Sequence, residues 1–353
     1  MTTSADKPFR VSFWVVLSLI VLVGVLCGLL IPSTSNPRTI RTLSGQTMGT
    51  QYTVRIAPEL PPDAGRIWRQ VDERLAEINR RMSTYDPESE LSRFNRLNSS
   101  DWFAVSAETA EVVAAALEIA EQTSGAFDPT VGPIVNLWGF GPDKGRTKPP
   151  SDDVVEDTLA RVGYKKVSVR IDPPALKKSI PEVYLDLSGI AKGYASDAIS
   201  ELLNEVGFSN TMVEIGGEVR ARGAKADGMP WRIGVEQPED RGRLIHAAVN
   251  LVNAGMATSG DYRNFFEHDG VRYSHTIDSL TGRPVQHDLA AVSVIVATCM
   301  EADALATALL VMGDEKGYDW CIARDISAMF LVRHGEQIIE RATPGFQKRI
   351  VTE

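Results

Sequence analysis

The chain has 353 residues, of which 43% are hydrophobic and 24% are charged, and its formal net charge is −9. A chain of this length can bury a full core, and its ordinary composition excludes a disordered or low-complexity protein. Because no long basic stripe occurs, the sequence also argues against nucleic-acid binding. An acidic protein that handles an anionic ligand needs local compensation of charge, for which a divalent cation is the obvious candidate.

An apolar segment near the N-terminus is long enough to cross a bilayer as one helix. Residues 11–31 carry no charged side chain, and Lys7 and Arg10 precede them, which predicts a cytoplasmic N-terminus and export of the rest of the chain. The apolar run is longer than the core of most signal peptides, so a retained anchor is favoured over a cleaved signal. The predicted organisation is a cytoplasmic N-terminus at residues 1–10, a transmembrane anchor or uncleaved signal at 11–31, a linker at 32–41 and one domain at 42–353.

The first part of this domain is predicted to alternate helices and strands with loops rich in turn formers. We expect a strand over residues 42–56 entered through Gly49, an amphipathic helix from Ile67 to Met82, a helical turn over Ser89–Asn95, a helix from Ser106 to Thr123, and a short helix end and strand over Leu159–Val169. The loop at 83–87 presents Tyr85, which is either a packed surface ring or a ring that stacks on a flat heterocycle. The loop at 125–133 places many turn formers next to Phe127, where a ligand can approach the backbone.

A predicted strand-turn-helix over residues 183–207 stands out in the middle of the chain. The prediction is a strand at Val183–Leu187, a turn at Ser188 and Gly189, and a helix from Ile190 to near Gly207. A strand that turns at a glycine into a helix leaves backbone N–H groups unpaired, and these favour an anion such as a phosphate. Asp186 and Lys192 add one charge of each sign. Many such turns are only connections, so this pattern alone does not define a site.

The second part of the domain is predicted to be rich in strands and to contain one long helix. Strands are expected over residues 211–223 with a Gly216-Gly217 turn, and at 231–236, 244–252, 256–260, 273–278, 290–297, 329–332 and 337–340. Thr298 and Glu301 have capping-box spacing and open a helix that runs to Met312. On it, Asp303 and Thr307 are four residues apart and share one face, where two oxygen ligands suit a hard cation. The alternative is a solvated Asp beside a Thr that bonds its own backbone.

Cys299 and Cys321 are the two cysteines of this predicted domain. They could pair in an oxidising compartment, but two buried thiols are the simpler interpretation, and their spacing matches no zinc motif.

Several of these stretches together resemble the ApbE-type FAD:protein FMN transferases. The matching pieces, in the order of that family, are Thr47–Thr50, Ser83–Tyr85, Gly125–Pro129, Asp186–Gly193, Glu214–Gly217, His275–Asp278, Thr281–Gly282 and Glu301–Thr307. Each motif is weak alone, but their joint order is a strong signal. One departure is Ser279, where the family often has a proline. The resemblance implies an α+β fold of mainly antiparallel sheet with packed helices, and no Gly-x-Gly-x-x-Gly follows a first strand to indicate a doubly wound sheet.

The resemblance also implies an activity and a set of site residues. The enzyme would use Mg2+ to transfer the FMN moiety of FAD to a Thr or Ser hydroxyl of a target protein, releasing AMP. Residues expected at the FAD site are Met48, Tyr85, Ala126, Phe127, Asp128, Asp186, Lys192 and Ile277. The expected metal ligands are the Gly189 carbonyl and the Asp303 and Thr307 side chains, and the expected catalytic residues are His275 and Asp303. His275 or a nearby carboxylate would deprotonate the acceptor hydroxyl, although His275 could instead only hydrogen-bond a phosphate or a strand neighbour.

The resemblance further suggests a partner and a location. The acceptor would be a membrane respiratory or ion-pumping flavoprotein with an exported domain, and the enzyme would be a single-pass protein of the inner membrane with its catalytic domain on the periplasmic side. Two alternatives stay open: an FAD pyrophosphatase that gives FMN and AMP, and a non-catalytic FAD-binding protein.

Overall fold

A computed structural model of the chain describes residues 40–57, 64–141, 148–238, 244–262, 264–335 and 337–352. The predicted anchor at residues 11–31 and nearly all of the linker lie outside these ranges. In the part of the chain that the structure describes, no helix combines the length and apolar character needed to cross a membrane.

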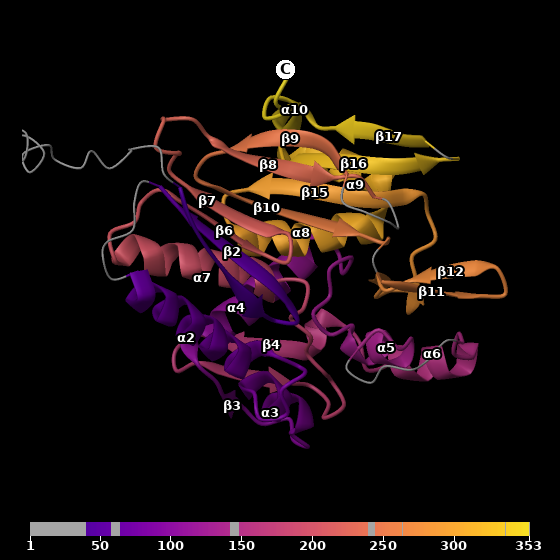
Figure 1. The fold of residues 1–353 in the computed structure, drawn as a ribbon. Coiled ribbons are helices and arrows are strands. Elements are labelled where there is room, and N and C mark those ends of the chain that lie inside the picture. The colour runs from indigo at the N-terminus through magenta and orange to yellow at the C-terminus, as the bar shows by residue number, and fades with distance from the viewer. Residues whose placement is uncertain are drawn as a thin grey trace, which may run out of the picture.

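An eight-stranded antiparallel sheet forms the centre of the domain (Figure 1). Its order is β1-β2-β6-β7-β10-β15-β16-β17, and every pair of neighbours is antiparallel. The strands are β1 (Arg41–Thr47), β2 (Thr50–Ile56), β6 (Thr211–Ile215), β7 (Glu218–Arg222), β10 (Ala254–Gly260), β15 (Leu289–Val296), β16 (Ser327–His334) and β17 (Gln337–Ala342). The predicted α+β class with a mainly antiparallel sheet is therefore confirmed.

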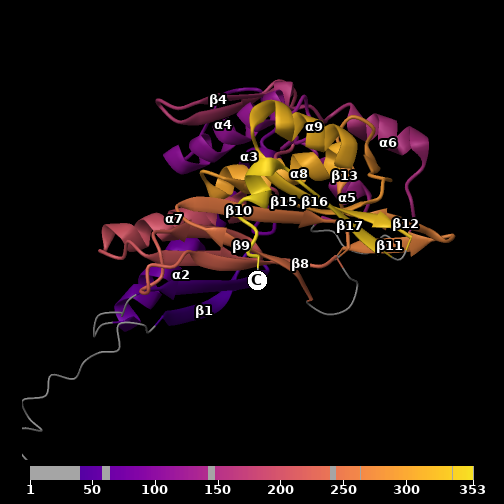
Figure 2. The ribbon, with the colours of Figure 1, turned by 90° about the horizontal axis from the view of Figure 1, so that it is seen from above.

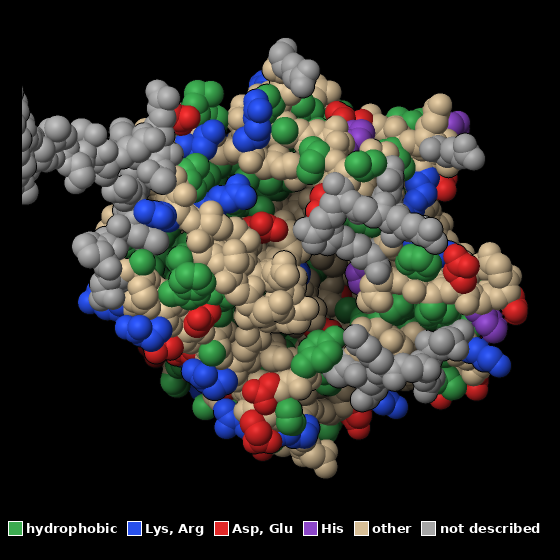
Figure 3. Space-filling view, viewed as in Figure 1, with side chains coloured by type: hydrophobic (Ala, Val, Ile, Leu, Met, Phe, Trp, Pro, Cys, Tyr) green, Lys and Arg blue, Asp and Glu red, His purple; other side chains and the backbone are tan. Residues whose placement is uncertain are grey.

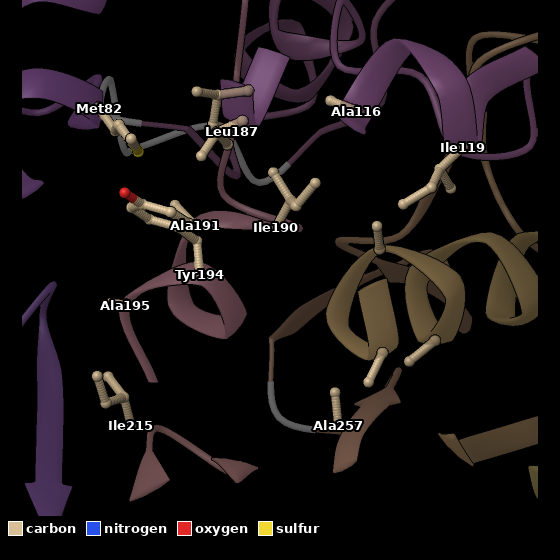
Figure 4. Close-up of a cluster of buried hydrophobic side chains, with 14 of the residues drawn as sticks. Met82, Ala116, Ile119, Leu187, Ile190, Ala191, Tyr194, Ala195, Ile215 and Ala257 are labelled. Atoms are coloured by element: carbon tan, nitrogen blue, oxygen red, sulfur yellow. The ribbon is translucent and has the colours of Figure 1, made fainter. Parts of the chain in front are cut away.

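Long helices cover one face of this sheet. They are α2 (Ala64–Met82), α4 (Ala107–Gln122), α7 (Ala191–Glu205), α8 (Cys299–Met312) and α9 (Asp314–Arg324). The buried side chains of α2 recur at the helical spacing seen in the sequence: Ile67, Val71, Leu75, Ile78 and Met82. Figure 4 shows part of this core, with residues of the α7 start (Leu187, Ile190, Ala191, Tyr194) among Met82 of α2, Ala116 and Ile119 of α4, and Ile215 and Ala257 of the sheet.

A two-stranded hairpin covers part of the opposite face, which we call the outer face. It consists of β8 (Trp231–Glu236) and β9 (Ile245–Leu251). Figure 2 shows this hairpin on one side of β10, β15 and β16, with α4, α8 and α9 on the other side. The hairpin packs with the short helix α10 (Pro344–Gln347) over a second core, which includes Met212, Val219, Met256, Trp231, Val235 and Phe346.

Smaller elements flank these layers. They are α3 (Glu90–Arg96), β3 (Phe103–Ala104), α5 (Gly132–Leu137), α6 (Asp152–Leu159), the 3-10 turn η1 (Tyr164–Lys166), β4 (Val167–Arg170), β5 (Ala175–Lys178), β11 (Phe265–His268), β12 (Val271–Ser274), β13 (Ile277–Asp278) and β14 (Arg283–Pro284). The hairpin β11–β12 and the helices α5 and α6 lie together at one side of the molecule (Figure 1), where a third core forms around Trp138 and Ile277.

The prediction of one strand over residues 42–56 is wrong, because this segment is a hairpin. Met48 and Gly49 form its turn with φ values of 48° and 70°, and β1 and β2 pair from Thr47↔Thr50 outward. A two-residue loop with positive φ at both positions is the turn that matches the twist of a hairpin. The alternation of side chains continues on both sides of the turn, so the pattern alone did not reveal it.

Two further predicted strands differ from the structure. Residues 183–187 belong to no strand, because the amide side chain of Asn95 pairs with both backbone groups of Leu185 and the N–H of Asp186 donates to the carbonyl of Pro129. The predicted strand at 273–278 is interrupted at His275, whose N–H donates to the carbonyl of Asn264. The other predicted strands and helices are confirmed to within a few residues.

Candidate functional site

A cavity of about 730 Å³ opens at one end of the central sheet, where β2 and β7 begin and β6 and β10 end. Figure 3 shows that this face of the molecule is hollowed near its centre. The volume lies in the range of sites that bury small ligands and cofactors. Of the predicted site residues, Tyr85, Ala126, Phe127, Asp128, Asp186, Gly189, Lys192, His275, Ile277, Asp303 and Thr307 line the cavity.

Met48 is the predicted site residue that does not line the cavity. It lies in the β1–β2 turn, half-buried, with its side chain against the core on the helix side of the sheet. Its neighbour Thr50 reaches the cavity instead.

The three predicted metal ligands come together at the junction of α7 and α8. A Cβ atom on Gly189 would lie 3.2 Å from Oγ1 of Thr307 and 3.2 Å from the ring of Phe127, so the turn before α7 approaches α8 as closely as only glycine easily allows. Asp303 is buried one turn before Thr307 on the same face of α8, and its Oδ2 accepts the N–H of Gly193 at 3.0 Å. The helix face inferred from the four-residue spacing therefore points at Gly189.

This donor set consists of oxygen atoms and suits a hard cation such as Mg2+. Asp303 supplies the one carboxylate, Thr307 a hydroxyl and Gly189 a backbone carbonyl. Among the described residues, no group of three or more His, Cys, Asp and Glu side chains could hold a metal ion. A cation at this place would therefore depend on neutral protein oxygens and on oxygens of the ligand.

Lys192 lies between two buried carboxylates. Its Nζ is 3.3 Å from Oε1 of Glu218 and 3.6 Å from Oδ1 of Asp303. Burial disfavours the ammonium, but Asp303 and Glu218 together raise the pKa of Lys192 above its ordinary value. Burial also raises the pKa of Glu218, and the positive charge of Lys192 opposes this rise. The second oxygen of Glu218, Oε2, is buried without a hydrogen-bond partner among the described residues.

His275 is held by the backbone of Asn264. The carbonyl of Asn264 lies 3.1 Å from Nδ1 of the ring and accepts the backbone N–H of His275 at 3.0 Å. This contact places the ring proton on Nδ1 and leaves Nε2 as the basic nitrogen. Burial lowers the pKa of His275, so its imidazole is neutral near pH 7. The edge of the ring also faces Phe140, with 6.4 Å between centroids.

The loop at residues 125–133 is held by its own polar side chains. The carboxylate of Asp128 is buried and accepts hydrogen bonds from the N–H and hydroxyl of Thr130 and the N–H of Tyr164. Ser279, at the position where the resemblance leads one to expect proline, donates its hydroxyl to the carbonyl of Gly125 at 2.6 Å. Asp128 therefore fixes the loop that presents Phe127 to the cavity.

Tyr85, Asp186 and Ile277 lie at different depths in the cavity. Tyr85 is 63% exposed at its mouth, and partial burial together with the nearby charge of Asp186 raises the pKa of its phenol. Asp186 accepts the N–H of Ser188 at 2.9 Å and so caps the turn before α7. Ile277 is buried in β13 beside Trp138.

Glu218, Arg55 and Arg232 are among the cavity residues that were not predicted. Glu218 follows the Gly216-Gly217 turn directly, and a buried carboxylate after two glycines at a strand start was a signal that could have been used. Arg55 and Arg232 lie on strands that do line the cavity. Whether the side chains of these two arginines face the cavity depends on how the β8–β9 hairpin packs over the sheet. No signal in the sequence indicates that packing.

Comparison with known proteins places the chain beside one set of enzymes. Residues 48–330 match the model of the ApbE family. The chain is 42% identical over 327 residues to an FAD:protein FMN transferase of Vibrio cholerae, a match that covers 92% of this chain and 97% of that protein. It is 38% identical over 338 residues to the FAD:protein FMN transferase of Haemophilus influenzae, covering 94% and 98%.

Solved structures agree with these matches. The flavin transferase ApbE from Vibrio cholerae superposes with a TM-score of 0.81 at 42% identity, over 89% of this chain and 100% of that one. The apo form of a flavinyl transferase ApbE from Pseudomonas stutzeri gives a TM-score of 0.80 at 37% identity, over 88% and 96%.

Proposed function

The chain belongs to the ApbE family, and we propose that it transfers FMN to a Thr or Ser hydroxyl with the help of Mg2+. It is a flavin transferase that moves FMN from FAD to a target protein. The finer proposal concerns the metal, the acceptor hydroxyl and the residues that act on them.

The close approach of Gly189 to Thr307, beside the buried Asp303, is the observation that carries the proposal. These residues would hold Mg2+, which when bound supplies positive charge at the phosphate oxygens of FAD. Lys192 adds a fixed positive charge at the same wall of the cavity, held by Glu218 and Asp303. An acidic protein thereby gains a local site for a pyrophosphate.

His275 is the proposed base. Its neutral ring, with Nδ1 engaged by Asn264, can take the proton of the acceptor hydroxyl at Nε2. The hydroxyl oxygen then bonds to the flavin-side phosphorus, the bond from that phosphorus to the bridging oxygen breaks, and AMP leaves with the bridging oxygen. The product is a phosphoester between FMN and the target protein.

An Asp303→Ala variant tests this assignment. The full-length protein is incubated with FAD, Mg2+ and a membrane fraction from cells that lack this chain, and covalent flavin fluorescence is followed in a denaturing gel together with AMP release. We expect wild type to label an acceptor, Asp303→Ala to bind FAD without releasing AMP, and the exposed Asp319→Ala control to behave as wild type. Intact FAD after incubation with wild type would show that the proposed chemistry is wrong.

We propose in addition that residues 11–31 anchor the protein in the inner membrane, with the catalytic domain in the periplasm and a membrane respiratory or ion-pumping flavoprotein as acceptor. The uncharged apolar run after Lys7 and Arg10 supports this orientation. In spheroplasts, added protease should then degrade the domain while the protein stays in the membrane after alkaline extraction. A protected domain or release by alkali would contradict the proposal.

A further inference from the structure

The proposed base is held by the stretch of chain that follows β10. After Gly260 the chain passes through Asp261 and Tyr262 to Asn264. The carbonyl of Asn264 engages both the backbone N–H and Nδ1 of His275. Tyr262 and Asn264 line the cavity, whereas Asp261 does not. The position of His275 therefore depends on what fixes this stretch to the rest of the fold.

The carboxylate of Asp261 is fixed by an arginine of the central sheet. Arg333 of β16 donates from Nη1 to Oδ2 at 2.8 Å and from Nη2 to Oδ1 at 2.6 Å. Two parallel bonds of this kind fix the orientation of the carboxylate as well as its distance. The backbone N–H of Arg333 donates in turn to the carbonyl of Asp288 at 2.8 Å. The pair therefore ties the end of β10 to a strand two places away in the sheet.

The backbone of Asp261 is held as well. Its N–H donates to the carbonyl of Ala290 in β15 at 3.1 Å, and its own carbonyl accepts Nη2 of Arg272 at 3.4 Å. The guanidinium of Arg272 lies over the ring of Phe265, 3.6 Å from its centroid, in the β11–β12 hairpin. Asp261 is thus the junction of β15, β16 and this hairpin, and Asn264 follows three residues later.

The carboxylate of Asp261 also acts on His275 through its charge. Burial lowers the pKa of His275, the negative charge of Asp261 opposes this, and the positive charge of Lys192 lowers the pKa further. Arg272 and Arg333 contact Asp261 and offset part of its charge. When the ring takes the proton of the acceptor hydroxyl it becomes an imidazolium, and a carboxylate nearby favours that charged form.

We propose that Asp261 and Arg333 are a positioning pair for the proposed base, which sets the place of Asn264 and so keeps Nε2 of His275 directed into the cavity. Neither Asp261 nor Arg333 lines the cavity, so each acts through His275 and not on a substrate. Asp261 stays ionised throughout and takes no proton, because the hydroxyl proton stops at Nε2. The inference rests on the proposed function, since the pair has this task only if His275 is the base.

Two substitutions that change the charge of the pair in opposite directions test this assignment. The full-length Asp261→Asn and Arg333→Gln variants are assayed with FAD, Mg2+ and the membrane fraction at several pH values. We expect kcat to fall about tenfold in both, because a small misplacement of a catalytic group is costly, with the dissociation constant for FAD unchanged. The acidic limb of kcat/KM should move to lower pH in Asp261→Asn, which removes the charge that favours the imidazolium. It should move to higher pH in Arg333→Gln, which leaves that charge less neutralised, and stay in place in the conservative Arg333→Lys.

A double-mutant comparison tests whether the pair acts through the ring. In the His275→Gln background, Asp261→Asn should change the remaining rate of AMP release by less than about twofold, because coupled residues are not additive. Glu108→Gln is the matched control, since it breaks a carboxylate–arginine pair with Arg74 on the helix side, at 2.8 Å. It should lower stability and leave the acidic limb where wild type has it.

Several results would overturn the inference. They are an equal loss from Asp261→Asn in both backgrounds, an acidic limb that stays in place in both charge variants, and weaker FAD binding in both. If Asp261→Asn does not fold, Arg333→Gln gives the same test from the more exposed member of the pair. Full activity in His275→Gln would refute the base and the pair together while the transferase function stands. If wild type releases no AMP, the proposed function itself fails.

Discussion

Lys192 and Glu218 form a buried ion pair with 3.3 Å between Nζ and Oε1, and Glu218 keeps its other carboxylate oxygen without a partner among the described residues. The pair joins two elements, because Lys192 stands in the first turn of α7 and Glu218 begins β7. Burying a carboxylate costs desolvation free energy. We expect the buried carboxylate of Glu218 to hold the Lys192 ammonium in one place at the wall of the cavity.

Replacing Glu218 by Gln should slow transfer more than it weakens FAD binding. The substitution keeps the shape of the side chain but removes one of the two negative charges that fix Lys192. We expect kcat to fall about tenfold, equivalent to about 1.4 kcal/mol, with thermal stability little changed. Steady-state kinetics and a melting curve measure both effects. The exposed Glu205→Gln serves as control, and an unchanged kcat in Glu218→Gln would show that the pair has no catalytic importance.

Gly189→Ala should raise the concentration of Mg2+ needed for half-maximal activity. The added methyl would stand 3.2 Å from Oγ1 of Thr307 and 3.2 Å from Phe127, which forces the turn away from α8. We expect a rise of about tenfold, because disturbing the groups that position metal ligands typically costs about 10–100-fold in metal affinity. Gly65→Ala is a suitable control, because a Cβ there meets only an arginine side chain at 3.8 Å. Equal Mg2+ dependence in the two variants would argue against Gly189 as a ligand.

Activity should fall only in moderately acidic solution. Burial lowers the pKa of His275, so the ring keeps its basic nitrogen free at pH 7 and gains a proton only below its ordinary pKa of about 6.5. The pH profile of kcat/KM should therefore rise to a plateau below this value. His275→Gln should remove that limb and most of the activity, while His268→Gln, on the β11–β12 hairpin, should leave the profile unchanged. If the acidic limb of the pH profile persists in His275→Gln, the titration that causes it belongs to another group.

Gly193→Ala should destabilise the domain rather than change its chemistry selectively. A Cβ at this position would lie 2.2 Å from the carbonyl oxygen of Cys299 and 2.8 Å from Cβ of Asp303. Helices α7 and α8 would have to separate, at an expected cost of about 1–3 kcal/mol in the free energy of unfolding. Chemical denaturation measures this cost. A stability equal to that of wild type would mean that the helices adjust without loss.

Local signals in the sequence predicted most helices correctly. The apolar stripe of α2 and the caps at Ser106 and Thr298 depend on residues a few positions apart, and the structure confirms each of them. The wrong strand predictions arose where a residue distant in the sequence supplies the hydrogen bonds. Residues 183–187 look like a strand, but the side chain of Asn95 takes the hydrogen bonds that a neighbouring strand would supply.

The cavity residues likewise could be predicted only where the sequence carries information about distant contacts. The order of weak motifs along the chain predicted that Gly189, Asp303 and Thr307 lie together, because the family resemblance carries information about distant contacts. It carries no information on Arg55 and Arg232, which meet the cavity only because the β8–β9 hairpin covers part of the outer face and leaves the rest open.

Because the cavity reaches from the helix side around the end of the sheet onto its outer face, FAD and a protein acceptor can occupy different parts of it. Phe127 lines the cavity on the helix side of the sheet, whereas Met212 lines it on the outer face. Neither substrate has to leave before the other arrives, so the phosphoryl group can pass directly within a ternary complex. Initial velocities measured at several concentrations of both substrates should give intersecting double-reciprocal lines, in contrast to the parallel lines of a ping-pong enzyme. AMP should compete with FAD and not with the acceptor.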